Sequence, residues 1–262
     1  MSIHFEQSGY GPDVVLIHGW GSHGGVWTEI ARELSKDFRV TVPDLPGHGR
    51  SHDFAPDAFT PEIMAEQIRH RLSGPAQWVG WSMGGLVALA AAQQLARAVT
   101  GLVLVNATPK YVQSPDWPHA MPPAVLEQFA QNLEQDYAGT IDRFLTLQTA
   151  GDDRAVLRRL REIFRHGEPV TAALRAGLRL LKEEDRRGVL AGIDTPALVI
   201  QGERDRLVPM GAARYYAEHL PRARLAPIPG AGHAPFLSHP AAFLEALKGF
   251  IQHDRTGEHI YD

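Results

Sequence analysis

The chain contains no cysteine and no long apolar run. The missing cysteines exclude disulfides, a thiolate nucleophile, cysteine-ligated zinc and iron–sulfur clusters. The longest uninterrupted apolar run, residues 86–92, is far shorter than the roughly 20 residues that a membrane-spanning helix needs. A surplus of positive charge is also absent, because 26 Lys and Arg stand against 30 Asp and Glu, and this argues against general nucleic-acid binding.

The first six residues, MSIHFE, contain neither a basic region nor an apolar stretch, so we expect no signal peptide. The chain has 262 residues, of which 44% are hydrophobic, so it can bury a large core without disulfides or structural metal ions. Its length fits one large α/β domain or two small ones. We expect a soluble, cytoplasmic monomer that binds neither membranes nor nucleic acid.

Short apolar runs rich in β-branched residues alternate with segments of helical character. Continuous apolar runs are typical of parallel strands that are buried on both faces. This alternation predicts an α/β fold, a mostly parallel sheet with helices on both faces. The strands are expected at 14–17, 38–42, 77–81, 102–105, 197–200 and 225–228, and the helices at 26–34, 61–72, 84–95, 211–219 and 240–250.

The alternation stops between about residues 107 and 193, where the pattern is helical and contains no convincing strand. An all-helical insertion into an alternating chain forms a separate layer, which we interpret as a cap over one end of the sheet. We therefore expect an α/β core formed by residues 1–108 and 192–252, a helical cap at 109–191, and a polar tail at 253–262.

The strongest motif is G-x-S-x-G at residues 80–84, with Ser82 at its centre. It follows an expected strand and precedes a helix of small residues, which is the setting of a nucleophile elbow. The turn would hold Ser82 at the carboxyl end of the sheet and at a helix N-terminus, where free N–H groups gather. An ordinary Gly/Ser turn is the alternative.

A serine hydroxyl is a poor nucleophile and needs a base and an orienting carboxylate. Two candidates lie downstream in loops that follow strands, where sites form in open α/β sheets. His233 lies in a glycine-flanked loop, and Asp205 follows the strand at 197–200. Glu203 is a close rival of Asp205 as the acid. The combination of the three positions predicts a Ser82, Asp205 and His233 triad.

The residues after the first apolar strand, His18-Gly19-Trp20-Gly21, form the candidate oxyanion loop. The backbone N–H groups of Trp20 and of Met83, which follows the nucleophile, would together stabilise a tetrahedral oxyanion. An ordinary turn is again the alternative. A second glycine-rich turn at residues 44–51, DLPGHGRS, is interpreted as supporting the fold rather than catalysis.

These motifs resemble the α/β-hydrolase superfamily, whose chain order is Ser, acid, His. More narrowly, the sequence is similar to the methyl ester esterases that act on pimeloyl-[acyl-carrier protein] in biotin synthesis. The narrower resemblance is found in HGWG at 18–21, VGWSMGGLVA at 79–88, RFLTLQT at 143–149 and HAPFLSHP at 233–240. It implies catalytic Ser82, Asp205 and His233, with Trp20, Ser82 and Phe144 near the substrate. No metal or organic cofactor is expected.

Arginines cluster in the expected cap, where residues 154–179 contain seven Arg and two Glu. Residues 154–165 are predicted to form one helix after Asp152 or Asp153, and four of its arginines fall within about 60° on one outward face. They are Arg154, Arg158, Arg161 and Arg165. Because arginine suits phosphate and carboxylate recognition, this stripe, with Arg143, is a candidate docking face for an acidic acyl carrier protein. A solvated helix face is the alternative.

Three other functions remain open. The same triad suits a broad-specificity short-chain carboxylesterase or lactonase that has no carrier partner. It also suits hydrolysis of a carbon–carbon bond in a diketone-type substrate. A ligand-binding protein that keeps the fold without turnover is the alternative from a different functional class.

Overall fold

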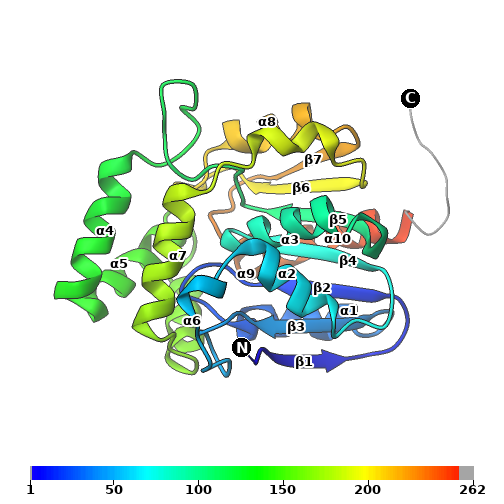
Figure 1. Cartoon of the computed structure of the whole chain (residues 1–262), viewed down its shortest axis with the longest axis horizontal. Coiled ribbons are helices and arrows are strands. Elements are labelled where there is room, and N and C mark those ends of the chain that lie inside the picture. The colour runs from blue at the N-terminus through cyan, green and yellow to red at the C-terminus, as the bar shows by residue number, and fades with distance from the viewer. Residues whose placement is uncertain (1, 254–262) are drawn as a thin grey trace.

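The computed structural model describes residues 2–253 and contains a seven-stranded sheet in the order β1-β3-β2-β4-β5-β6-β7. The strands are β1 (His4–Ser8), β2 (Asp13–Ile17), β3 (Arg39–Asp44), β4 (Ala76–Trp81), β5 (Val99–Val105), β6 (Ala197–Gly202) and β7 (Ala223–Ile228). All neighbouring strands are parallel except β1, which pairs with β3 in the antiparallel sense. Figure 1 shows the strands stacked in this order. The predicted fold class is confirmed.

The central strands are buried along their whole length, as their continuous apolar sequences predict. Every residue of β2, β4 and β6 is buried. In the parallel register, Leu16 of β2 lies beside Val79 of β4, and Val79 lies beside Val103 of β5. Both faces of these strands must therefore be covered by helices. A strand with one face exposed to solvent would instead alternate between apolar and polar residues.

Helices cover both faces of the sheet (Figure 1). One face is covered by α2 (Pro61–Arg69), α3 (Met83–Gln94) and α8 (Met210–His219), and the other by α1 (Thr28–Leu34), α9 (Pro235–Ser238) and α10 (Pro240–His253). Short 3₁₀ turns are formed by Gly24–Trp27, Pro56–Ala58, Ala96–Ala98 and Arg187–Gly192. The first ten residues of α3 are all buried, because this helix packs between the sheet and α2.

Four helices lie between β5 and β6 in the chain: α4 (Pro123–Gln135), α5 (Tyr137–Gln148), α6 (Arg154–Arg165) and α7 (Thr171–Glu183). They gather beside the end of the sheet at which the parallel strands terminate (Figure 1). Asp153 caps α6, because its side chain accepts a 2.7 Å hydrogen bond from the Ala155 amide. We refer to α4–α7 as the cap; the outer limits expected for it, residues 109 and 191, stay a prediction.

Two features differ from the sequence-based expectations. Strand β1 was not predicted, because HFEQS is a short edge strand with polar exposed residues and has no continuous apolar run. Helix α10 continues to His253, whereas the tail was expected to begin there; the rest of that tail, residues 254–262, lies outside the described residues. Within residues 2–253, no helix combines the length and apolarity required to cross a membrane.

Candidate active site

Ser82 lies between β4 and α3 in a strained backbone conformation, with φ 53° and ψ −122°. A non-glycine residue rarely adopts a positive φ, and such strain concentrates at functional sites. The turn is also too tight for a side chain at Gly84, where an added β-carbon would lie 2.6 Å from the carbonyl oxygens of Ile17 and His18. The G-x-S-x-G segment therefore forms the sharp strand-to-helix turn that its sequence predicts.

His233 and Asp205 meet at the carboxyl ends of β7 and β6. The Nδ1 atom of His233 lies 2.7 Å from Asp205 Oδ2. Asp205 Oδ1 accepts hydrogen bonds from the amides of Leu207 and Val208, which fix the carboxylate. Glu203, the rival acid, is exposed. Asp205 is therefore the carboxylate that orients this imidazole.

The other imidazole nitrogen, His233 Nε2, is buried and makes no hydrogen bond to any of residues 2–253. With Nδ1 donating to Asp205, Nε2 is the nitrogen that can accept a proton. Trp81, the residue before the nucleophile, donates a 2.8 Å hydrogen bond from its indole to the carbonyl oxygen of His233. This bond ties the histidine loop directly to the strand that delivers Ser82.

Asn106 is a site residue that the sequence analysis missed. It follows β5, has φ 45°, and is fully buried. Its Nδ2 atom donates to Asp205 Oδ2 at 2.7 Å and to the Gly232 carbonyl at 3.1 Å. The signal was available, because a polar residue directly after a buried parallel strand lies at the edge of the sheet where sites form.

Tyr111 is a second residue that the sequence analysis did not single out. Its side chain is buried beside Ser82, and burial raises its pKa while the Ser82 hydroxyl opposes the rise. The phenol is therefore neutral and retains its O–H group next to the Ser82 hydroxyl.

The candidate oxyanion loop lies against the nucleophile. A β-carbon added at Gly19 would lie 3.0 Å from the β-carbon of Ser82. Met83 is the first residue of α3, so its amide belongs to the first turn, which has no acceptor within the helix. The assignment of the Trp20 and Met83 amides as oxyanion donors stays a prediction, and the packing of this loop on Ser82 supports it.

The cap holds the side chain of Trp20. Its indole Nε1 donates a 2.9 Å hydrogen bond to the Leu174 carbonyl of α7, and its ring packs edge-on against Phe144 of α5 with 4.7 Å between centroids. Gly177 of α7 allows this approach, because a β-carbon there would lie 2.4 Å from Trp20 Cδ1 and 3.4 Å from Met83 Sδ. Cap helix α7 thus contacts both residues assigned to the oxyanion hole.

Two buried imidazoles, those of His18 and His48, lie next to each other beside this loop, with 5.3 Å between their ring centroids. His18 accepts a 2.9 Å hydrogen bond from the Leu45 amide through Nε2, while its Nδ1 lies 2.8 Å from the Gly19 carbonyl. Burial, reinforced by His48, lowers the pKa of His18 to about 3, and burial lowers the pKa of His48 to about 4. His18 is therefore neutral, which is the state in which Nε2 can accept.

Asp44 anchors the neighbouring turn, as expected for a segment that supports the fold. Its carboxylate accepts hydrogen bonds from the Gly24 amide at 2.7 Å and from the Arg50 amide at 3.0 Å. It does not contact the triad through any hydrogen bond found among residues 2–253.

The cap arginines do not form one uniform stripe. Arg154, Arg158 and Arg165 are exposed. Arg161 is different, because its guanidinium binds both oxygens of Asp142 on α5, at 2.7 and 2.9 Å. Arg161 still reaches the surface, with 35% of its side chain exposed, so a docking role for the four arginines stays a prediction. Arg143 forms an exposed 3.3 Å ion pair with Asp136.

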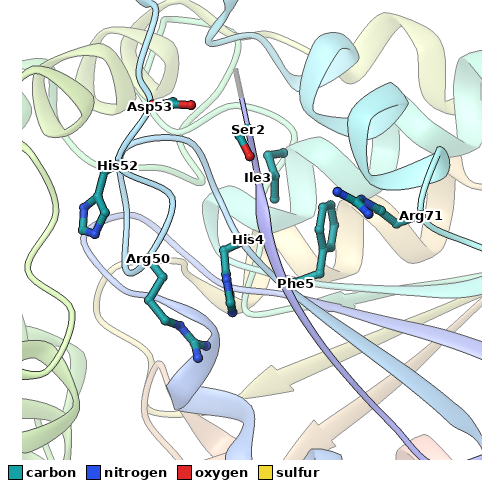
Figure 2. A pocket seen from close by; sticks show the side chains of 8 residues that line it. All are labelled: Ser2, Ile3, His4, Phe5, Arg50, His52, Asp53 and Arg71. Atoms are coloured by element: carbon teal, nitrogen blue, oxygen red, sulfur yellow. The ribbon is translucent and has the colours of Figure 1, made fainter.

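Hollows among residues 2–253 also lie away from Ser82, Asp205 and His233. A polar one of about 450 Å³ borders β1 and is lined by Ser2, Ile3, His4, Phe5, Arg50, His52, Asp53 and Arg71 (Figure 2). Its two arginines lie on opposite sides of β1 in Figure 2, with Arg50 paired to Glu6 and Arg71 placed over the Phe5 ring. They do not converge on a common ligand position.

Two further hollows lie in the cap. One, of about 520 Å³, lies between α5 and α6, and one of about 320 Å³ lies between α4 and α5. Across the described part of the chain, no group of three or more His, Asp or Glu side chains is arranged to hold a metal ion.

The sequence matches a family model for the alpha/beta hydrolase fold over residues 12–240. The chain belongs to the α/β-hydrolase family. Among curated members, a pimeloyl-[acyl-carrier protein] methyl ester esterase from Nitrosomonas europaea is 46% identical and covers 94% of this chain and 98% of its own length. The enzyme of the same name from Xanthomonas campestris pv. campestris is 43% identical, covering 95% and 98%. The resemblance stated from the sequence motifs is confirmed.

Solved α/β-hydrolase structures share the fold at lower identity. An esterase from Exiguobacterium antarcticum superposes with a TM-score of 0.88 at 22% identity, covering 95% of each chain. An enol-lactonase from Burkholderia xenovorans superposes with a TM-score of 0.83 at 24% identity, covering 95% of this chain and 96% of its own. These likenesses show the fold alone.

We predict that Gly177→Ala lowers turnover, while the helix-favouring effect of alanine offsets part of the stability lost by crowding the buried Trp20 ring. Alanine favours the helix by about 1 kcal/mol, but its methyl group would displace Trp20 and Met83. We expect kcat on a short ester to fall about tenfold or more, since small misplacements at a reacting centre are costly. Steady-state kinetics and thermal unfolding measure the two effects. Gly249→Ala in α10 is the control, because a β-carbon added there would meet no atom of another segment within 4 Å. Equal activity of the two variants would contradict the prediction.

We predict that acid destabilises the fold through His18 and His48. Their folded pKa values lie below 6.5, so the unfolded chain binds more protons than the native state in this range. The stability is fully present above pH 6.5 and is lost as the pH falls towards 4, by about 3 kcal/mol for His48. Denaturant unfolding between pH 7 and 4 measures it.

The matched variant is His48→Phe, which keeps a ring against Phe59. It should show a shallower loss of unfolding free energy with falling pH, whatever its stability at pH 7. A slope identical to that of the unmodified protein would exclude His48 as a cause.

Proposed function

We propose that this α/β-hydrolase is a serine carboxylesterase that hydrolyses the methyl ester of pimeloyl-[acyl-carrier protein] to methanol and the free acid. The observation that supports the chemistry most directly is the pairing of His233 with Asp205 beside the strained Ser82 turn. The proposed substrate is supported by the name shared by relatives that are 43–46% identical to the chain over almost its whole length.

The first half-reaction forms an acyl-enzyme. His233 Nε2 takes the proton of Ser82 as Oγ attacks the ester carbonyl, and the negative charge develops on the carbonyl oxygen. The amides of Trp20 and Met83 stabilise that oxyanion. When the tetrahedral intermediate collapses, the carbon–oxygen bond to the methoxy group breaks, and His233 gives its proton to the departing methanol.

The second half-reaction releases the acid. His233 takes a proton from water, the resulting hydroxide attacks the acyl carbonyl, and Ser82 leaves with the proton returned by His233. Asp205 holds the imidazole in one tautomer and stabilises its protonated form. All three residues come from one chain, so the proposed reaction requires no second subunit, and it requires no cofactor.

The exposed cap arginines are proposed to bind the carrier. Arg154 and Arg158 lie one turn apart on α6, and neither forms an ion pair with any of residues 2–253. Three cations at this surface, with Arg165, suit an acidic protein and the phosphate of its pantetheine arm. Arg161 and Arg143 already have carboxylate partners, so they contribute less.

We predict that Ser82→Ala lowers kcat on any ester substrate by at least about 10⁴-fold, because the nucleophile and its base act as a unit. Hydrolysis of a short p-nitrophenyl ester and covalent labelling by a fluorophosphonate measure this. The unmodified protein should be labelled once per chain and the variant not at all. Normal turnover by the variant would refute the mechanism, and an unmodified protein without labelling or turnover would favour the ligand-binding alternative.

We predict that Arg154→Glu combined with Arg158→Glu lowers kcat/KM on the carrier-linked methyl ester at least about tenfold, which corresponds to about 1.4 kcal/mol of lost docking energy. Turnover of a short ester should be unchanged. Arg32→Glu combined with Arg214→Glu is the control, because it makes the same charge change at exposed positions on α1 and α8. Equal loss on both substrates, or on neither, would favour the short-chain esterase or lactonase alternative.

A further inference from the structure

The loop that holds His233 is attached to the cap by two consecutive backbone amides. The His233 amide donates a 3.0 Å hydrogen bond to the carbonyl oxygen of Gln148, the last residue of α5. The Gly232 amide donates a 3.2 Å hydrogen bond to Oδ1 of Asp152, in the turn between α5 and α6. One of these acceptors is a main-chain atom, and the other is a side chain that substitution can remove.

The histidine loop is confined from both sides at Gly232. A β-carbon added there would lie 2.7 Å from Asp152 Oδ2 and 3.1 Å from the Gln148 carbonyl oxygen. On the opposite side, a β-carbon at Gly202 of β6 would lie 2.1 Å from the Gly232 carbonyl oxygen. The loop therefore has almost no space in which to shift, and the cap forms one wall of that space.

The environment of Asp152 does not suit a residue kept for stability. Burial raises the pKa of its carboxyl, and the Gly232 amide, His239, Ser238 and Arg204 oppose that rise. Its Oδ2 atom is buried and forms no hydrogen bond within 3.5 Å to any of residues 2–253, although the Ser238 side chain lies near enough to stabilise the carboxylate. A partly buried carboxylate without full pairing costs free energy. Asp152 is also not needed to begin α6, because Asp153 performs that capping.

We propose that Asp152 is a positioning residue, which fixes the backbone before His233 so that Nε2 stays directed towards Ser82. The proposal rests on the proposed function of the triad. The Asp205 bond fixes the far end of the imidazole, while the Asp152 and Gln148 bonds fix the main chain from which the ring projects. Loss of the Asp152 bond leaves the ring bonded to Asp205 on a backbone that can move.

This role differs from substrate binding in what it changes. A displaced imidazole slows proton transfer in the transition state, so kcat falls while KM is retained. The loss should be the same for a short ester and for the carrier-linked ester, because both use the same His233. Substitution of the docking arginines should instead lower kcat/KM on the carrier-linked ester alone, although Arg154 lies only two residues from Asp152.

The test compares Asp152→Ala, Asp152→Asn and Asp153→Ala on a short p-nitrophenyl ester. Asp153→Ala is the matched control, because it removes the neighbouring carboxylate and weakens the start of α6 without touching the histidine loop. We expect Asp152→Ala to lower kcat about tenfold to a hundredfold, with KM changed less than about twofold. Asp152→Asn keeps an acceptor oxygen and should recover most of the activity, while Asp153→Ala should stay within about twofold of the unmodified kcat.

Three results would overturn the proposal: equal kcat for Asp152→Ala and Asp153→Ala, a change confined to KM, or no recovery in Asp152→Asn. Thermal unfolding accompanies each measurement, and Asp152→Leu, which fills similar space without an acceptor, replaces Asp152→Ala if that variant does not fold. Fluorophosphonate labelling of the unmodified protein tests the proposed serine esterase function separately from the positioning role of Asp152. Absence of labelling refutes the proposed function itself, whereas normal labelling with an unaffected Asp152→Ala refutes only the positioning role.

Discussion

A 2.7 Å contact between His233 Nδ1 and Asp205 Oδ2 joins two loops that leave the sheet after different strands. Both groups are almost completely buried, so the contact is shielded from water and is stronger than the same pair at a surface. Its geometry requires β6 and β7 to stay in register, because each loop begins where its strand ends. The parallel sheet is thus the rigid frame from which the orientation of one imidazole follows.

Several neighbouring side chains hold the His233–Asp205 contact in place through hydrogen bonds. Asn106 bonds the same carboxylate oxygen that faces the imidazole, and Trp81 bonds the histidine carbonyl. Asn106 follows β5 and Trp81 ends β4, whereas Asp205 and His233 follow β6 and β7. Four adjacent strands therefore determine where the imidazole lies. The cap adds two further contacts, at Gly232 and at Trp20. The candidate active site therefore lies between the sheet and the cap, two layers built from distant parts of the sequence.

The sequence was sufficient for the features that have local signals. The elbow around Ser82 is encoded within five residues, and the apolar strands and the capped start of α6 are encoded within similar spans. The residues that were missed act across long separations: Asn106 meets Asp205 over 99 positions, and Asp152 meets Gly232 over 80. The place of Asn106 directly after a buried strand marks it as a candidate, but no periodicity or spacing reports which distant residue it or Asp152 meets. The pairing of Arg161 with Asp142 illustrates the same limit, because it depends on how α5 and α6 pack.

The close fit of α7 to the oxyanion loop has a consequence for engineering. Insertions between strands of this fold are attractive parts to exchange when a different substrate is wanted. Here the insertion supplies the Leu174 carbonyl and a residue without a side chain at position 177, and both contact Trp20. A transplanted segment would have to reproduce both features, or the recipient would gain a new specificity on a disordered oxyanion loop. The cap of this protein is a structural part of the candidate active site, so exchanging it would change the packing of Trp20 as well as the substrate specificity.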